Sequence, residues 1–97
     1  MCQLDRLQRL RTEIYRIARR HNADKVYVFG SCARKEETPE SDIDFLADFN
    51  GEASLFDQVG LQLELEDVLS CKVDVLPLSS LDDPDFGPIA KRDMVLL

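Results

Sequence analysis

The chain has 97 residues, a formal net charge of −7 at pH 7, 44% hydrophobic and 32% charged residues, and three cysteines. This length suits one small domain with a single core, which we expect to span residues 1–97. The composition excludes disorder and fibrous repeats, and no apolar run in the sequence approaches the roughly 20 residues of a membrane helix. An odd number of cysteines without metal-ligand spacing predicts reduced thiols and a cytoplasmic protein.

The charge is distributed unevenly along the chain. Residues 1–25 hold seven Lys or Arg against three acids, whereas residues 26–97 hold five against sixteen. A protein that grips a long polynucleotide usually carries a basic track, so direct nucleic-acid binding is not expected. The acidic part suits a metal ion and a small nucleotide, and the basic N-terminal part could dock an acidic partner.

Apolar residues recur at three- and four-residue steps from Gln3 to about Arg20. This spacing predicts one amphipathic helix with most of its arginines on the other face. We interpret that face as solvated rather than as a binding surface. His21 and Asn22 suit the end of the helix, where its dipole is negative, and His21 is interpreted as a helix-end residue rather than a catalytic one.

The next stretch has the features of a phosphate-binding turn. Lys25 to Phe29 is short, β-branched and aromatic, which predicts a buried strand, and the Gly30-Ser31 pair after it predicts a tight turn that opens a short helix. Gly30 allows the backbone to approach a ligand closely. A helix that begins at Ser31 directs unpaired N–H groups and the positive end of its dipole at phosphate oxygens.

A second strand with two carboxylates follows this turn. The run from Asp42 to Ala47 predicts a strand, and side chains alternate along a strand, so Asp42 and Asp44 emerge on the same face. Two neighbouring carboxylates repel one another unless a cation lies between them. Mg²⁺ prefers such oxygen ligands, and Mn²⁺ fits the same set. The pair therefore predicts a divalent metal site.

A long helix is predicted after a turn at residues 48–52. Ser54 and Asp57 have the spacing of a capping box, and a helix from about Leu55 to Leu69 follows. Its apolar surface is wider than one helix face; we expect it to be core, although it permits a homo-oligomer. Its apolar side chains are Leu55, Phe56, Val59, Leu61, Leu63, Leu65, Val68 and Leu69. Its acids, interpreted as a solvated face, include Glu64, Glu66 and Asp67.

The third predicted strand, Lys72 to Leu76, contains one carboxylate, Asp74. A buried charge costs several kcal/mol unless it is paired or bound to a metal. Asp74 is therefore either a water-facing residue on an edge strand or a further metal ligand. The presence of Asp42 and Asp44 favours the ligand.

The C-terminal segment predicts two short elements. Pro77 and the polar cluster after it end the third strand. Pro88 suits the first turn of a short helix that continues to about Arg92. The apolar residues 94–97 indicate a short terminal strand.

Together these motifs resemble the DNA polymerase β-like nucleotidyltransferase superfamily. The resemblance depends on Gly30-Ser31, on Asp42-x-Asp44 ten residues later, and on a single strand aspartate, Asp74, some thirty residues further on. Within the superfamily the chain is similar to a minimal nucleotidyltransferase, the MNT class. This resemblance implies an α/β (α+β) fold in which a small mixed β-sheet is flanked by helices.

The resemblance also implies how the nucleotide is held. Gly30 and Ser31 would bind its β- and γ-phosphates, and Arg34 would steady the phosphates or the helix after the turn. Lys35 stands where the family usually has glycine. If that position needs a positive φ, a lysine there strains the turn and alters the shape of the loop. A lysine near the triphosphate could equally add a contact.

The implied metal ligands are the three aspartates. Asp42 and Asp44 would ligate Mg²⁺, and Asp74 would complete the metal site and help to deprotonate the acceptor. The implied reaction is nucleotidyl transfer, in which a hydroxyl attacks the α-phosphate of ATP and pyrophosphate leaves.

The resemblance finally implies a protein acceptor. Larger members of the superfamily hold their acceptor with additional domains, for which 97 residues leave no room. MNT proteins typically accompany HEPN-domain ribonuclease toxins and attach AMP to them, commonly at a tyrosine, so the chain is expected to be an antitoxin. Two alternatives stay open: a non-catalytic antitoxin that blocks its partner by contact, or a nucleotidyltransferase that acts on RNA or a small molecule with another subunit.

Overall fold

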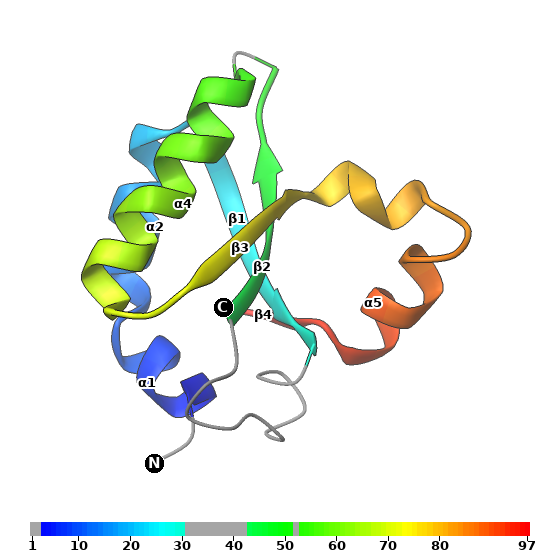
Figure 1. The fold of residues 1–97 in the computed structure, drawn as a ribbon, viewed down its shortest axis with the longest axis horizontal. Helices are drawn as coiled ribbons and strands as arrows, with labels where there is room; N and C mark the ends of the chain where they lie inside the picture. The colour runs from blue at the N-terminus through cyan, green and yellow to red at the C-terminus, as the bar shows by residue number, and fades with distance from the viewer. Residues whose placement is uncertain (1–2, 31–42, 52) are drawn as a thin grey trace.

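The fold is a mixed β-sheet flanked by helices, as expected (Figure 1). The computed structural model describes residues 3–30, 43–51 and 53–97. In the sheet, β1 pairs antiparallel with β2 and with β4, whereas β2 pairs parallel with β3. The strand order is β3-β2-β1-β4, and the strands are β1 (Ala23–Phe29), β2 (Ile43–Phe49), β3 (Val73–Pro77) and β4 (Val95–Leu96).

Helices lie on both sides of this sheet. Two of them, α2 and α4, lie side by side against one face, and α5 lies on the other side of the strands (Figure 1). Across the ranges that the structure describes, no helix has the length and apolar character needed to cross a membrane. The helices are α1 (Gln3–Arg9), α2 (Arg11–Arg20), α4 (Leu55–Leu69), the 3-10 helix η1 (Leu78–Asp82) and α5 (Gly87–Asp93).

The core lies between the sheet and the α2–α4 layer. Alternate residues of the strands are buried there, among them Val28 in β1, Phe45 in β2 and Val75 in β3. Burial of such a side chain stabilises the fold by about 1.5–3 kcal/mol. Because side chains alternate along a strand, the residues between them, including Asp44 and Asp74, belong to the opposite face of the sheet.

The prediction of a single N-terminal helix from the apolar periodicity was wrong. The structure has two helices with Leu10 between them, at φ −93° and ψ 9°. The interruption lets α1 turn toward the C-terminal end of α4, where the Arg6 guanidinium donates a hydrogen bond of 2.7 Å to the backbone oxygen of Leu69. Leu7 is fully buried in the core. No proline or glycine marks this break, so the sequence carried no local signal for it.

Other boundaries differ from the prediction by a few residues. β1 begins at Ala23 rather than Lys25, and β2 continues to Phe49, where a turn was predicted, because Phe49 pairs with Ala23. Asn22 makes the turn before β1 with φ 61°. The 3-10 helix η1 was not predicted, whereas the short α5 and β4 were.

The limits of α4 are confirmed, and so is its capping box. The Ser54 backbone N–H donates to the carboxylate of Asp57 at 2.9 Å, and the Ser54 side chain accepts from the backbone of Asp57 in return. This hydrogen bond, followed by one from Asn22, lowers the pKa of Asp57. The first turn of α4 is therefore fixed both to itself and to the turn before β1.

The prediction that the whole apolar surface of α4 is core was wrong. Leu61, Leu65 and Leu69 are buried. Several of the remaining apolar side chains are exposed instead, because α4 meets the sheet and α2 with only part of its circumference. The most exposed are Leu55, Phe56, Val59 and Leu63.

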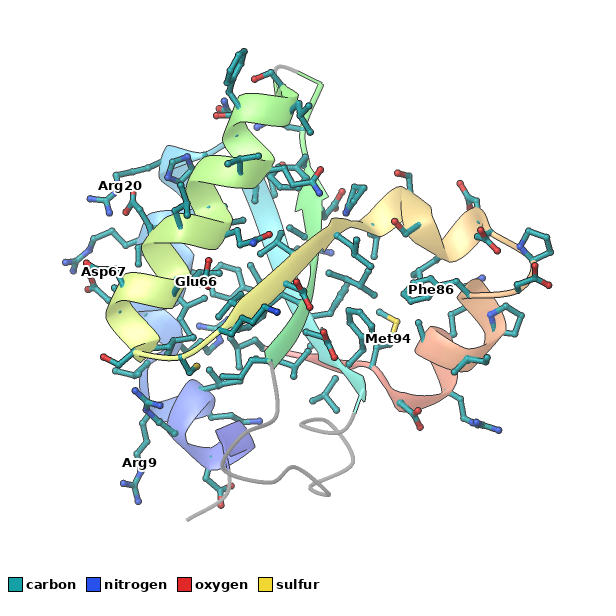
Figure 2. The ribbon with its side chains drawn as sticks, in the orientation of Figure 1. Arg9, Arg20, Glu66, Asp67, Phe86 and Met94 are labelled. Carbon is teal, nitrogen blue, oxygen red and sulfur yellow. The ribbon has the colours of Figure 1, made fainter. Side chains whose placement is uncertain are left out.

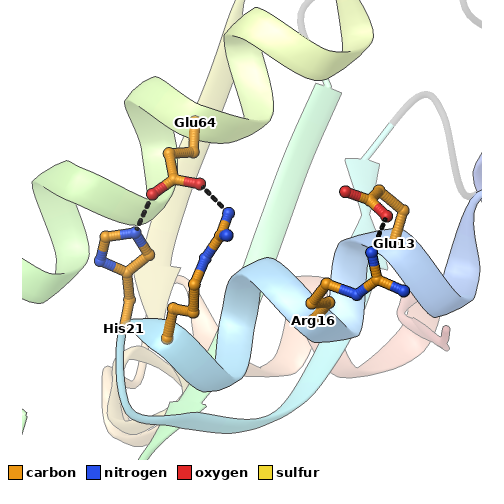
Figure 3. A network of polar contacts seen from close by, with 5 residues as sticks. Glu13, Arg16, His21 and Glu64 are labelled. Atoms are coloured by element: carbon orange, nitrogen blue, oxygen red, sulfur yellow. Dashed lines mark hydrogen bonds and ion pairs between the residues drawn. The ribbon is translucent and has the colours of Figure 1, made fainter.

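Glu64 is partly exposed, as its predicted place on a solvated face implies, but its carboxylate is also paired. It forms an ion pair with Arg20, and its Oε1 lies 2.8 Å from Nε2 of His21 (Figure 3). Gly60 leaves room for this arrangement, since a Cβ there would stand 2.7 Å from Cε1 of the His21 ring. The interaction joins the C-terminal end of α2 to the middle of α4. The hydrogen bond with His21, followed by that with Arg20, lowers the pKa of Glu64.

Replacement of Glu64 by Gln should lower stability at neutral pH by less than about 1 kcal/mol, because the pair is half-exposed and solvent screens it. Since the folded-state pKa lies below the ordinary value of 4.5, the stabilisation is fully present above that value and is lost as pH falls through the folded pKa. Thermal unfolding of both proteins near neutral pH and in acid measures this. Equal differences at the two pH values would contradict the assignment; Glu66→Gln serves as the control.

Candidate active site

Two of the predicted aspartates are neighbours in the sheet. Asp44 on β2 is the direct register partner of Asp74 on β3, and the two strands are parallel. Adjacent strands lie about 4.8 Å apart, so register partners share one face of the sheet at that spacing. Both residues are partly exposed. The structure thus brings together two carboxylates that are thirty positions apart in the sequence.

These two carboxylates line a pocket. It has a volume of about 480 Å³, within the range of roughly 300–1,000 Å³ that is usual for small-molecule sites. Besides the two carboxylates, it has two glutamine side chains from α4 and an apolar wall. Its lining residues are Phe29, Asp44, Gln58, Gln62, Asp74, Val75, Leu76 and Phe86.

Gly30 stands at the end of β1, beside Asp44. Its φ is +74°, a conformation that side-chain-bearing residues adopt at a cost, and a Cβ added to it would lie 2.7 Å from Oδ2 of Asp44. Both the backbone conformation and the space beside Asp44 therefore require glycine. This agrees with a tight turn at Gly30; its role in phosphate binding stays a prediction.

Two aromatic rings form the apolar wall of the pocket. Phe29 and Phe86 meet edge to face, with centroids 5.4 Å apart and planes at 87°. Phe86 precedes α5 and lies on the α5 side of the strands (Figure 2). Sequence reasoning placed Phe29 only in a buried strand and did not single out Phe86, because nothing in the local pattern indicates that residues 57 positions apart meet.

The sequence also did not indicate the two pocket glutamines, Gln58 and Gln62. The Gln58 side-chain amide donates a hydrogen bond of 2.9 Å to the backbone oxygen of Val75 on the outer edge of β3. This bond fixes α4 against the strand that carries Asp74. Gln62, one turn further along α4, lines the same pocket. Isolated glutamines on a helix give no signal that could have been read in the sequence.

A second pocket, of about 340 Å³, lies against α2 and β1. Its charged lining residues are Arg11, Arg19, Asp24 and Lys25. One carboxylate among three cations is the reverse of a divalent metal site. The pocket that contains Asp44 and Asp74 is therefore the candidate for nucleotide chemistry.

Three of the predicted site residues, Ser31, Arg34 and Asp42, lie outside the described residues, as does Lys35. Their roles stay predictions. Among the residues that are described, no group of three or more His, Cys, Asp or Glu could hold a metal ion. The pair of Asp44 and Asp74 nevertheless supplies partly exposed oxygen donors on adjacent strands, which fit a hard divalent cation.

Comparison with known proteins gives independent evidence on the family of this chain. The model of the nucleotidyltransferase domain family matches residues 8–97. A protein of Methanocaldococcus jannaschii, named provisionally as a protein adenylyltransferase, is 40% identical over 75 residues, which are 77% of this chain and 81% of the relative.

Solved structures show the same fold. One, described provisionally as a minimal nucleotidyltransferase, is 34% identical with a TM-score of 0.83, and the match covers 100% of this chain and 97% of the other. A toxin–antitoxin complex, MntA–HpeT with a Y104A mutation, is 21% identical with a TM-score of 0.70, covering 90% of this chain and 70% of the other. A toxin–antitoxin structure with AMP-PNP is 18% identical with a TM-score of 0.70, covering 88% and 69%. The last two likenesses concern the fold alone.

Proposed function

We propose a reaction for this chain, which belongs to the nucleotidyltransferase domain family: it transfers AMP from ATP to a hydroxyl group of a partner toxin and acts as its antitoxin. One observation carries the proposal above all others. Asp44 and Asp74 are register partners on parallel strands, and both line one pocket. A pair of carboxylates beside a glycine turn is suited to hold a cation and a triphosphate together.

Asp44 and Asp74 would hold the metal ion, together with Asp42 as the third predicted ligand. Mg²⁺ is the proposed ion because the donors are carboxylate oxygens. When bound, it supplies charge stabilisation for the phosphates during transfer. Gly30 brings the backbone close to Asp44, and we propose that it lets the β- and γ-phosphates approach, with Ser31 and Arg34 completing their contacts.

In the proposed step, the acceptor oxygen forms a bond to the α-phosphorus and the bond between that phosphorus and the bridging oxygen of the β-phosphate breaks. Pyrophosphate is the leaving group. The hydroxyl proton passes to the Asp74 carboxylate, which faces the pocket. A tyrosine is the proposed acceptor, since its pKa of about 10 is the lowest among hydroxyl side chains. The Phe29–Phe86 wall offers an aromatic acceptor an edge-to-face contact.

A protein acceptor is supported by two kinds of relative. The Methanocaldococcus jannaschii relative has the provisional name of a protein adenylyltransferase, and the MntA–HpeT structure is a toxin–antitoxin complex with the same fold. From the resemblance to the MNT class, we further propose that this protein acceptor is a toxin with a HEPN ribonuclease domain. The odd number of cysteines in the sequence suits the cytoplasm as the proposed compartment.

The position of the label in ATP tests the reaction. The chain is incubated with the protein encoded beside it and with ATP that is radiolabelled at either the α- or the γ-phosphate. We expect label in the partner only from α-labelled ATP, and a rate of labelling about 10²–10³-fold lower with Asp74→Asn. Asp48→Asn, on β2 but outside the pocket lining, is the matched control and should label as the wild type does. Label from the γ-phosphate would show phosphorylation instead and would overturn the proposal.

The same variants address the contact-only alternative. If the toxin is neutralised by adenylylation, cells that express toxin together with Asp74→Asn should stop growing, whereas Asp48→Asn should protect them. Protection by both variants would mean that contact suffices.

A further inference from the structure

The outward face of α4 is an exposed apolar surface. The exposed fractions are 73% for Leu55, 88% for Phe56, 49% for Val59 and 60% for Leu63. We call these four residues the α4 stripe. Isolated exposed apolar residues are common, but four on one face of one helix form a contiguous patch of the kind that marks interaction sites.

The α4 stripe lies on a different face of the helix from the side chains that enter the core. Leu61, Leu65 and Leu69 already bury the inner side of α4, and at 3.6 residues per turn the stripe lies on the helix face away from them. Burial of apolar surface is worth roughly 25 cal/mol per Å². The free protein forgoes this stabilisation at the stripe, and a bound protein could recover it.

The charge of α4 indicates what kind of surface covers the stripe. The helix carries four acids and no Lys or Arg. Asp57 and Glu64 are engaged with Asn22, Arg20 and His21, whereas Glu66 and Asp67 extend the acidic character along the C-terminal half of the helix (Figure 2). A second copy that packed its own α4 here would bring like charges together. The surface is complementary instead to a different protein whose apolar patch is rimmed by Lys or Arg.

The stripe also adjoins the candidate active site. Gln58 and Gln62, which line the pocket, belong to the same helix. Positions three and four apart on a helix are neighbours, so Leu55 and Val59 lie directly beside these glutamines on the outward side. A protein bound to the stripe would therefore extend to the edge of the pocket.

We propose that the α4 stripe is the docking surface for the acceptor protein, which presents a complementary apolar patch with a basic rim and so brings its hydroxyl to the pocket. This inference rests on the proposed function in one respect, that the acceptor is a protein. Contact at the stripe sets the affinity for the acceptor, and the carboxylates set the rate of transfer.

A double variant, Phe56→Ser with Leu63→Ser, tests the docking. Two exposed residues are changed, so the fold should be retained. The control is Ile89→Ser with Leu96→Ser, whose side chains are 58% and 56% exposed on α5 and β4. Loss of two large anchors typically weakens an interface by about 100-fold. We expect the Kd and KM for the protein encoded beside this chain to rise by about that factor, with the KM for ATP unchanged; the control should behave as the wild type.

The outcomes separate the docking surface from the reaction. If the wild type binds the neighbouring protein without modifying it, and the stripe variant loses that binding, the reaction fails and the docking stands. Equal binding by the stripe variant, or no binding by the wild type, would overturn the docking. Sedimentation of the chain alone covers the remaining case: a wild-type dimer that becomes monomeric in the stripe variant would show that a second copy covers the stripe, which also overturns the proposal.

Discussion

Replacement of Asp44 or Asp74 by Asn should reduce AMP transfer by about 10²–10³-fold, because each change removes one charge from the site without changing its shape. Both side chains are partly exposed on adjacent strands, so the free energy of unfolding should change by less than about 1 kcal/mol. Initial rates at saturating ATP and partner, together with thermal unfolding, measure the two effects separately.

A variant with both aspartates replaced tests whether the two carboxylates act as one unit. Groups that act as one unit give non-additive losses, so Asp44→Asn with Asp74→Asn should be little worse than either single change. Asp48→Asn on β2 should keep the wild-type rate. A single variant that retains full activity would show that the pair does not act in the reaction.

The second large effect is expected for Gly30→Ala. The new Cβ would stand 2.7 Å from Oδ2 of Asp44 at a residue whose φ is +74°, so either the carboxylate or the turn must move. A displacement of about 1 Å at a reacting group can cost roughly 10²-fold in rate. A left-handed conformation costs a residue with a side chain about 1–2 kcal/mol, so the variant should also unfold at a lower temperature.

Gly51→Ala is the matched control for this change. A Cβ added at Gly51 would meet no heavy atom of the described residues within 4 Å, and the φ of Gly51 is not in the left-handed region. We expect wild-type rate and stability there. If Gly30→Ala transfers AMP at the wild-type rate, the close approach of Gly30 to Asp44 has no part in the site.

Much of the fold follows from local sequence rules. The short β-branched and aromatic run from Lys25 to Phe29 predicted a buried strand, and the run from Asp42 to Ala47 predicted a second strand; the described residues of both runs lie in the sheet. The Ser54–Asp57 box fixed the start of α4, because reciprocal capping needs only residues three apart. Such features depend on neighbours in the chain, which the sequence displays directly.

What the sequence did not predict depends on contacts between distant segments. The break at Leu10 arises because α1 reaches Leu69 at the end of α4. The ion pair of Glu64 with Arg20 joins residues 44 positions apart. Periodicity marks the apolar surface of α4 but does not say how much of it the sheet can cover, so Phe56 was expected in the core.

The candidate site was predictable to a similar degree. The spacing of Gly30, Asp44 and Asp74 indicated a nucleotide site, and the structure places these three together. Gln58 and Phe86 belong to the site because tertiary packing brings them to the pocket, which the local sequence does not indicate. Asp42 and the turn residues after Gly30 lie outside the described part of the chain, so their assigned roles stay predictions.

The most direct measurement is the intact mass of the protein encoded beside this one after incubation with this chain, ATP and Mg²⁺, with the Asp44→Asn, Asp74→Asn variant in parallel. The proposed function predicts a gain of whole adenylyl units with the wild type and none with the variant. An unchanged mass, while the two proteins still bind each other, would contradict adenylyl transfer to that partner.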